Sequence, residues 1–124
     1  MSVFYQPAVL GALTLPNRIL MAPLGRARAH EETRQPLPRV VTYYQQRASA
    51  GLIISEATHV SAESVSRPGG SAIHHNAQVQ AWLPITEAVH AAGGRTLNTP
   101  DEASFDVGGD QGYIDYPFLQ AVAH

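Results

Sequence analysis

The sequence predicts an α/β fold that forms an incomplete TIM-type (β/α)8 barrel. Short apolar segments alternate with segments of helical periodicity, in the order strand, loop, helix, strand, loop, helix. The loops that follow the expected strands are long, as they are in α/β barrels. The chain has 124 residues, whereas a complete barrel needs roughly 200–250. We therefore expect about two βα units, preceded by an N-terminal hairpin and followed by an irregular C-terminal tail.

The N-terminal segment is expected to form β structure. Residues 3–15 alternate short apolar runs with Pro7 and Gly11, which predicts a small β-hairpin or arm. Residues 18–22 (RILMA) then form an apolar run that stops at Pro23. This run predicts a buried strand, the first strand of the barrel.

The first helix follows a polar loop over residues 26–37. Pro38 suits the first position of a helix, because its missing N–H would have no partner there. Apolar residues recur at helical spacing from Val40 to Ala48, and Gly51 is expected to end the helix.

The second βα unit begins with residues 52–55 (LIIS), which have the continuous apolar pattern of a buried parallel strand. Residues 56–75 form a long loop, and Asn76 is a suitable N-cap for a second helix that closes at Gly93-Gly94. Its inward stripe is expected to consist of Val79, Trp82, Ile85 and Val89. Pro84 implies either a bend or a helix that begins near Pro84.

The remainder of the chain has a different pattern. Residues 98–117 are polar and glycine-rich and lack the pattern of a buried strand. We therefore divide the chain into residues 1–95, with the arm and two βα units, and a tail segment over residues 96–124. Two parallel strands leave unpaired edges, which favours self-association.

Composition excludes several classes of function. The chain has no cysteine, which excludes disulfides and thiolate catalysis. Its eight basic residues are scattered arginines and its net charge is -2, so no nucleic-acid partner is expected. No apolar run is long enough for a membrane span and no signal-peptide pattern is present, so we expect no membrane partner and a cytoplasmic location.

Isolated polar residues do not predict a catalytic or metal site. Glu56 follows the second expected strand, and we interpret it as a residue that accepts hydrogen bonds from loops rather than as a catalytic carboxylate. His74 and His75 lack a third ligand at suitable spacing, so they are interpreted as solvated loop residues and no metal site is expected.

Two motifs resemble the start of the Old Yellow Enzyme family of FMN-dependent NAD(P)H ene-reductases. Residues 15–24 (LPNRILMAPL) resemble the family's first barrel strand, and residues 43–58 (YYQQRASAGLIISEAT) resemble its first barrel helix and second strand. The resemblance implies that Pro23, Leu24 and Gly25 lie against the flavin, together with Ala57. Gly25 stands where the family usually has threonine or cysteine, a donor to the flavin.

Two further segments extend the resemblance. Residues 86–95 (TEAVHAAGGR) resemble the helix before the family's third strand, and residues 97–117 resemble the family's extreme C-terminus. The resemblance implies that Phe105 approaches the dimethylbenzene edge of the flavin, while Asp106 stands in place of a second aromatic residue. Most of the barrel is expected to be absent between Arg95 and Leu97.

The resemblance implies an oxidoreductase with FMN as cofactor and NAD(P)H as co-substrate. Its small-molecule substrates would be enones or nitro compounds with an activated C=C bond. No segment matches the family's catalytic histidine and tyrosine or its phosphate-binding arginines, so no catalytic residue is assigned. We expect an internally deleted form that is inactive alone. The alternatives are a non-catalytic fragment that self-associates or docks on an intact homologue, and a degraded gene product.

Overall fold

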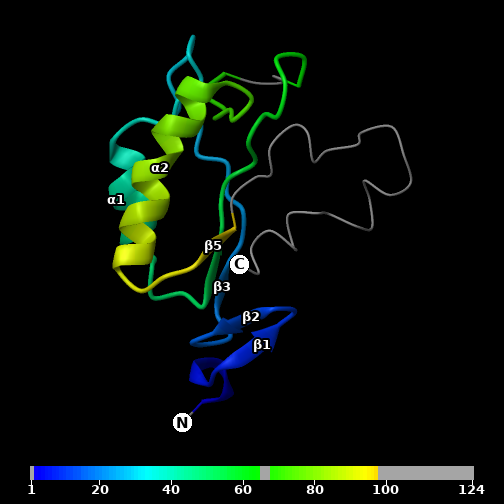
Figure 1. Ribbon diagram of the computed structural model, residues 1–124, viewed down its shortest axis with the longest axis vertical. Coiled ribbons are helices and arrows are strands. Elements are labelled where there is room, and N and C mark those ends of the chain that lie inside the picture. Colours follow the sequence, from blue (N-terminus) through cyan, green and yellow to red (C-terminus); the bar gives the residue numbers. More distant parts are fainter. Residues whose placement is uncertain (1, 65–67, 98–124) are drawn as a thin grey trace, which may run out of the picture.

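The computed structural model describes residues 2–64 and 68–97 (Figure 1). The elements are η1 (Val3–Tyr5), β1 (Ala8–Leu10), β2 (Leu13–Leu15), β3 (Leu20–Met21), α1 (Arg39–Gln45), β4 (Leu52–Ile54), α2 (Asn76–Ala91) and β5 (Thr96–Leu97). The order of strands and helices agrees with the βα units expected from the sequence.

A parallel sheet of three short strands forms the centre of the described structure, in the order β3-β4-β5. Leu20 lies opposite Leu52, and Ile53 lies opposite Thr96. Helix α1 connects β3 to β4 and helix α2 connects β4 to β5, and both helices lie on the same side of the strands (Figure 1). This βαβαβ arrangement is the repeating pattern of an α/β barrel, and over the described residues the sheet does not close.

The third strand, β5, was not expected as a distinct element. It has only two residues, too few to give a recognisable apolar pattern, and is identified by its pairing with β4. The glycine-rich segment after Leu97 lies outside the described residues.

The N-terminal hairpin is present as predicted. Strands β1 and β2 pair antiparallel, with Ala8 opposite Leu15 and Leu10 opposite Leu13. Gly11 adopts a φ of 58° in the turn, a left-handed conformation that glycine accepts without strain. Leu15 is buried, whereas Val9 is 77% exposed, so the described residues cover only part of the hairpin.

The core lies between the two helices and β4. It consists of Val40, Tyr44, Ala48, Ile53, Trp82, Ile85 and Val89. The indole Nε1–H of Trp82 donates to the carbonyl oxygen of Ala72 at 3.3 Å, which joins α2 to the long loop before it. Trp82 is therefore a core residue, as the sequence predicted.

Helix α2 differs from the expectation at its N-terminus and in its buried stripe. His75, not Asn76, is the N-cap, and its backbone N–H donates to Gln78 Oε1 at 3.0 Å. Val79 is 37% exposed, and Gln78 is buried instead. The reason is a tertiary contact, because Gln78 Nε2 donates to the carbonyl oxygen of Thr33 at 3.0 Å. The helix continues through Pro84, so it does not begin there.

Strand β3 was predicted to be buried, and this prediction is wrong. Ile19 is 42% exposed and Leu20 is 44% exposed. Strand β3 pairs with β4 on one edge, and no described strand covers the other edge. The apolar sequence is that of an internal strand, but over the described residues β3 is an edge strand.

Helix α1 ends at Gln45, earlier than the predicted end at Gly51. Residues 46–50 form turns instead, and the N–H of Gly51 donates to the carbonyl oxygen of Ile19 at 2.8 Å. Neither α1 nor α2 has the length and apolar character that crossing a lipid bilayer requires.

Candidate functional site

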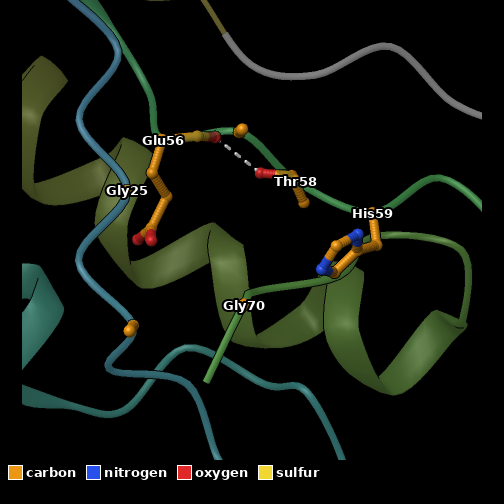
Figure 2. Close-up of a pocket in the computed structure, with 7 residues that line it drawn as sticks. Gly25, Glu56, Thr58, His59 and Gly70 are labelled. Carbon is orange, nitrogen blue, oxygen red and sulfur yellow. Dashed lines mark hydrogen bonds between the residues drawn. The ribbon is translucent and has the colours of Figure 1, made fainter. Parts of the chain in front are cut away.

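A cavity of about 210 Å³ lies beyond the carboxyl ends of β3 and β4 (Figure 2). It is lined by Gly25, Ala27, Glu56, Ala57, Thr58, His59 and Gly70. In parallel α/β structures the carboxyl ends of the strands are the usual place for ligands, because loops from several strands meet there. This cavity is therefore the candidate functional site.

The loop after β3 is held against the loop before α2. The N–H of Ala29 donates to the carbonyl oxygen of Gly69 at 3.1 Å. A Cβ at Gly69 would lie 2.8 Å from the carbonyl oxygen of Ala27, so only glycine permits this approach. Ala27 itself has a φ of 51°, an unfavourable conformation for alanine that the packing of the two loops maintains.

The loop after β4 is held by hydrogen bonds that place His59 beside the cavity. The hydroxyl of Thr58 donates to the carbonyl oxygen of Glu56 at 2.8 Å. The N–H of His59 donates to the carbonyl oxygen of Ser71 at 2.9 Å. In return, the N–H of Ile73 donates to the carbonyl oxygen of His59 at 3.0 Å. The imidazole of His59 and the carboxylate of Glu56 lie on opposite sides of the cavity (Figure 2).

Glu56 is the charged residue of the site and is 3% exposed. Its Oε2 accepts a long hydrogen bond of 3.4 Å from the N–H of Arg26. Its own N–H donates to the hydroxyl of Tyr44 at 2.9 Å. These bonds tie the loop after β3 and helix α1 to the end of β4, which agrees with the interpretation of Glu56 as a residue that holds loops together.

One carboxylate oxygen of Glu56 remains without a partner. Glu56 Oε1 is buried and has no hydrogen bond within the described part of the chain. The Ser71 Oγ beside it also lacks a hydrogen bond of good geometry, and the two groups are close enough for the hydroxyl to lower the pKa of Glu56. Burial raises the pKa of Glu56, while the bond from Arg26, its positive charge and the Ser71 hydroxyl act in the opposite direction. Burial also raises the pKa of Tyr44 to about 12, so its hydroxyl stays neutral.

The raised pKa of Glu56 predicts a pH-dependent stability. Because the folded state binds this proton more tightly than the unfolded state, protonation stabilises the fold. The stabilisation is complete below the unfolded pKa and is lost as pH rises through the folded pKa. Glu56→Gln resembles the protonated carboxyl, so we expect it to increase the free energy of unfolding at pH 7. This difference from wild type should shrink toward zero near pH 4.

Urea unfolding between pH 4 and pH 8 checks this expectation. Glu87→Gln is the matched control, because Glu87 is exposed on α2 and its replacement should cause no comparable pH-dependent difference. A Glu56→Gln variant that is less stable than wild type at pH 7 would contradict the expected effect of burial.

The structure brings together two of the five residues that the resemblance assigned to flavin binding. Gly25 and Ala57 line the same cavity, although they follow different strands. Pro23 and Leu24 are exposed and do not line it, and Phe105 lies outside the described residues.

The cavity is also lined by four residues that were not expected at a site, namely Ala27, Thr58, His59 and Gly70. A usable signal was present for Thr58 and His59, because they directly follow a buried parallel strand, where ligand-binding loops begin. No such signal identifies Ala27 or Gly70, which reach the cavity through contacts between loops.

Metal binding receives no support from the histidines. His75 is exposed at the start of α2, and His74 is half-buried. Within residues 2–64 and 68–97, no group of three or more histidines and carboxylates is arranged to hold a metal ion.

Comparisons with known proteins point to one family. The sequence model of the NADH:flavin oxidoreductase / NADH oxidase family matches residues 3–106. The chain is 42% identical over 95 residues to a chanoclavine-I aldehyde reductase of Penicillium roqueforti, covering 75% of this chain and 26% of the relative. It is 40% identical over 88 residues to 12-oxophytodienoate reductase 1 of Oryza sativa subsp. japonica, covering 70% of this chain and 23% of the relative.

Solved structures give the same result. An Old Yellow Enzyme homologue from Zymomonas mobilis superposes with a TM-score of 0.74 and 51% identity, covering 77% of this chain and 27% of that one. The Old Yellow Enzyme from Trypanosoma cruzi superposes with a TM-score of 0.74 and 42% identity, covering 77% of this chain and 26% of that one. The chain thus spans about a quarter of the length of these proteins. The expected family resemblance and the incomplete-barrel fold class are confirmed.

Proposed function

The chain belongs to the NADH:flavin oxidoreductase / NADH oxidase family, and on that premise we propose that it carries the first part of an ene-reductase barrel. FMN is the cofactor of this family and NAD(P)H its co-substrate. The activity proposed for the complete barrel is reduction of activated C=C bonds in enones or nitro compounds. The proposal for this chain is that it is inactive alone.

The described residues fit only part of FMN. Gly25 and Ala57 offer small groups at two neighbouring strand ends, which suits close approach of a flat ring. The cavity of about 210 Å³ is smaller than the roughly 300 Å³ at the lower end of sites for whole ligands. Its lining contains no arginine or lysine, the side chains that usually bind phosphate. The described residues do not fit the complete cofactor, and we derive no reaction step through it.

The observation that carries the proposal is the meeting of Gly25 and Ala57 at one cavity. They come from strands β3 and β4 of a parallel sheet, in a chain 51% identical over its matched part to an Old Yellow Enzyme homologue. Both residues follow their strands at the carboxyl end, where α/β barrels bind their ligands. This supports a role for Gly25 and Ala57 as contacts of the flavin in a complete barrel.

FMN binding by the purified chain is the first test. We expect no stoichiometric quenching of flavin fluorescence, no FMN retained on gel filtration, and no oxidation of NADPH in the presence of 2-cyclohexenone. The reason is that the described part of the chain supplies one edge of a flavin site without a phosphate anchor. The Zymomonas mobilis homologue, treated in parallel, is the positive control. A yellow protein that oxidises NADPH would contradict inactivity of the chain alone.

A chimera tests the positive part of the proposal. Residues 1–97 of this chain would replace the matching segment of the Zymomonas mobilis homologue, which keeps its own remaining barrel. If the segment is a competent first part of an ene-reductase barrel, the chimera retains FMN. A folded but colourless chimera would count against the assignment of Gly25 and Ala57 to the flavin site.

A second candidate function is supported by the exposed edge of β3. Ile19 and Leu20 are each more than 40% exposed, and with Tyr5 and Ala50 they line a groove beside the strand. An apolar strand edge favours pairing with another chain. Under this candidate the chain is a non-catalytic fragment that self-associates or docks on an intact homologue. Gel filtration in the FMN experiment tests this candidate. A chain that elutes as a monomer at every concentration, both alone and mixed with the homologue, argues against it.

A further inference from the structure

The segments that build the groove beside β3 are basic. This groove has a volume of about 660 Å³ and lies between residues 17–21 and residues 46–50. Its lining comes from residues 1–30 and 33–55, which together contain six arginines and no aspartate or glutamate. Arg47 is the charged residue of the lining, so the groove combines apolar side chains with a positive charge.

The guanidinium of Arg47 is held at the groove by Tyr43. Its Nη1 donates to the carbonyl oxygen of Tyr43 at 2.7 Å, and its Cζ lies 3.9 Å from the centroid of the Tyr43 ring. Stacking on an aromatic ring positions a guanidinium while its remaining N–H groups stay free to donate to an acceptor. Ile19 and Leu20, each more than 40% exposed, form the apolar side of the same groove. The groove therefore suits an apolar segment that carries a carboxylate.

The C-terminal segment of the chain, residues 98–124, has the complementary charge and lies outside the described residues. It contains five acidic residues and no arginine or lysine, which gives a net charge of -5 with histidine neutral. The residues before it contain all eight arginines and the other five acidic residues, which gives +3, and the two values sum to the -2 of the whole chain. The charges of the two parts therefore attract each other.

Within this segment, residues 112–116 (GYIDY) have the composition that the groove favours. Tyrosine and isoleucine have a high preference for β-strands, and Asp115 places one carboxylate among them. Pro117 follows, and it would end a strand there because it has no N–H to donate.

We propose that residues 112–116 of the chain's own C-terminal segment occupy this groove and pair with the free edge of β3, and that the Asp115 carboxylate accepts from the Arg47 guanidinium. A strand added to an open edge gains main-chain hydrogen bonds, and the charged contact sets its register. Residues 98–111 connect it to β5 and reach about 45 Å when extended. The position beyond β3 is three strand spacings from β5, only about 15 Å.

The inference does not depend on the proposed flavin function, because it uses only the groove beside β3 and the distribution of charge along the chain. It differs from the second candidate function in its occupant. There another chain covers the edge of β3, whereas here the same chain covers it. The experiment separates these two occupants.

A spin label in the C-terminal segment of the full chain tests the contact. The chain has no cysteine, so Ala121→Cys provides a single attachment site. In ¹H–¹⁵N NMR spectra we expect the paramagnetic label to remove most of the signal intensity of residues 17–21 and 46–50. Residues 76–80, at the start of α2, should keep theirs. A mixture of ¹⁵N-labelled chain without spin label and spin-labelled chain without ¹⁵N should show no such loss, because the contact lies within one chain.

Charge reversal tests the pairing of Arg47 with Asp115. Arg47→Glu and Asp115→Arg should each abolish the loss of intensity, and the two substitutions together should restore it. A merely structural role of Arg47 would not produce this rescue. Arg39→Glu is the matched control, because Arg39 is exposed at the opposite end of α1, and the loss of intensity should remain as in wild type.

Loss of intensity within one chain that depends on both charges supports the proposal. Three outcomes overturn it: no loss at residues 17–21 and 46–50, an equal loss in wild type and the charge-reversed variants, or a loss that appears in the mixture. The last outcome would mean that the segment of a second copy occupies the groove. If Arg47→Glu is poorly folded, Asp115→Arg keeps the test decisive, because Asp115 lies outside the segments that build the groove.

Discussion

Replacing Tyr44 by alanine is expected to lower the free energy of unfolding by about 3–5 kcal/mol, the range for truncating a large aromatic residue in a core. Tyr44 is 1% exposed, and its ring centroid lies 6.3 Å from that of Trp82. It thus joins α1 to α2 at the centre of the core cluster. The described domain is small and buries a limited core, so a loss of this size is expected to abolish cooperative folding.

Tyr44→Phe separates the ring from the hydroxyl. It keeps the packing against Trp82 but removes the acceptor for the N–H of Glu56, which should cost about 1–3 kcal/mol. Urea unfolding followed by far-UV circular dichroism measures the stability of Tyr44→Phe and shows whether Tyr44→Ala retains a cooperative transition. We expect the order wild type, Tyr44→Phe, Tyr44→Ala in decreasing stability. A Tyr44→Ala variant as stable as Tyr44→Phe would show that the ring is not part of the core.

Much of this fold was predictable because local sequence and tertiary structure agree. Leu52 and Ile53 of the apolar run are buried as expected, and Trp82, Ile85 and Val89 recur at helical spacing on the buried side of α2. The predictions that were wrong depend on neighbours. Leu20 is exposed because no described strand covers that edge, and Gln78 replaces Val79 in the buried stripe because it bonds to Thr33.

The candidate site was predictable only in part. Gly25 and Ala57 were identified by resemblance, and the parallel sheet brings them to one cavity. The resemblance could not show that Glu56 Oε1 and His59 Nε2 lack partners, because that depends on which side chains reach the cavity. It also gave no reason to include Gly70, which is placed there by the contact of Gly69 with Ala27.

Gly51→Ala is expected to be the most damaging substitution of a small residue in the described chain. A Cβ at Gly51 would collide with the carbonyl oxygen of Asn17 and lie 3.0 Å from Asn17 Oδ1. Neither segment can withdraw easily. Asn17 Nδ2 donates to the carbonyl oxygen of Ser49 at 2.9 Å. The N–H of Gly51 donates to the carbonyl oxygen of Ile19 at 2.8 Å. We expect a loss of about 3 kcal/mol, the upper part of the range for overpacking.

Gly93→Ala is the control that distinguishes this collision from a general effect of replacing glycine. Gly93 has a φ of 83° at the end of α2, and a Cβ there would meet no atom within 4 Å. Its cost should be only the conformational one of about 1 kcal/mol. Thermal unfolding compares the two variants. Since Gly51 sets the pairing of β3 with β4, Gly51→Ala should also separate Gly25 from Ala57 and destroy the cavity. Gly93→Ala should leave the strand pairing and the cavity intact. Equal losses for the two variants would show that the contact with Asn17 does not determine the position of β4.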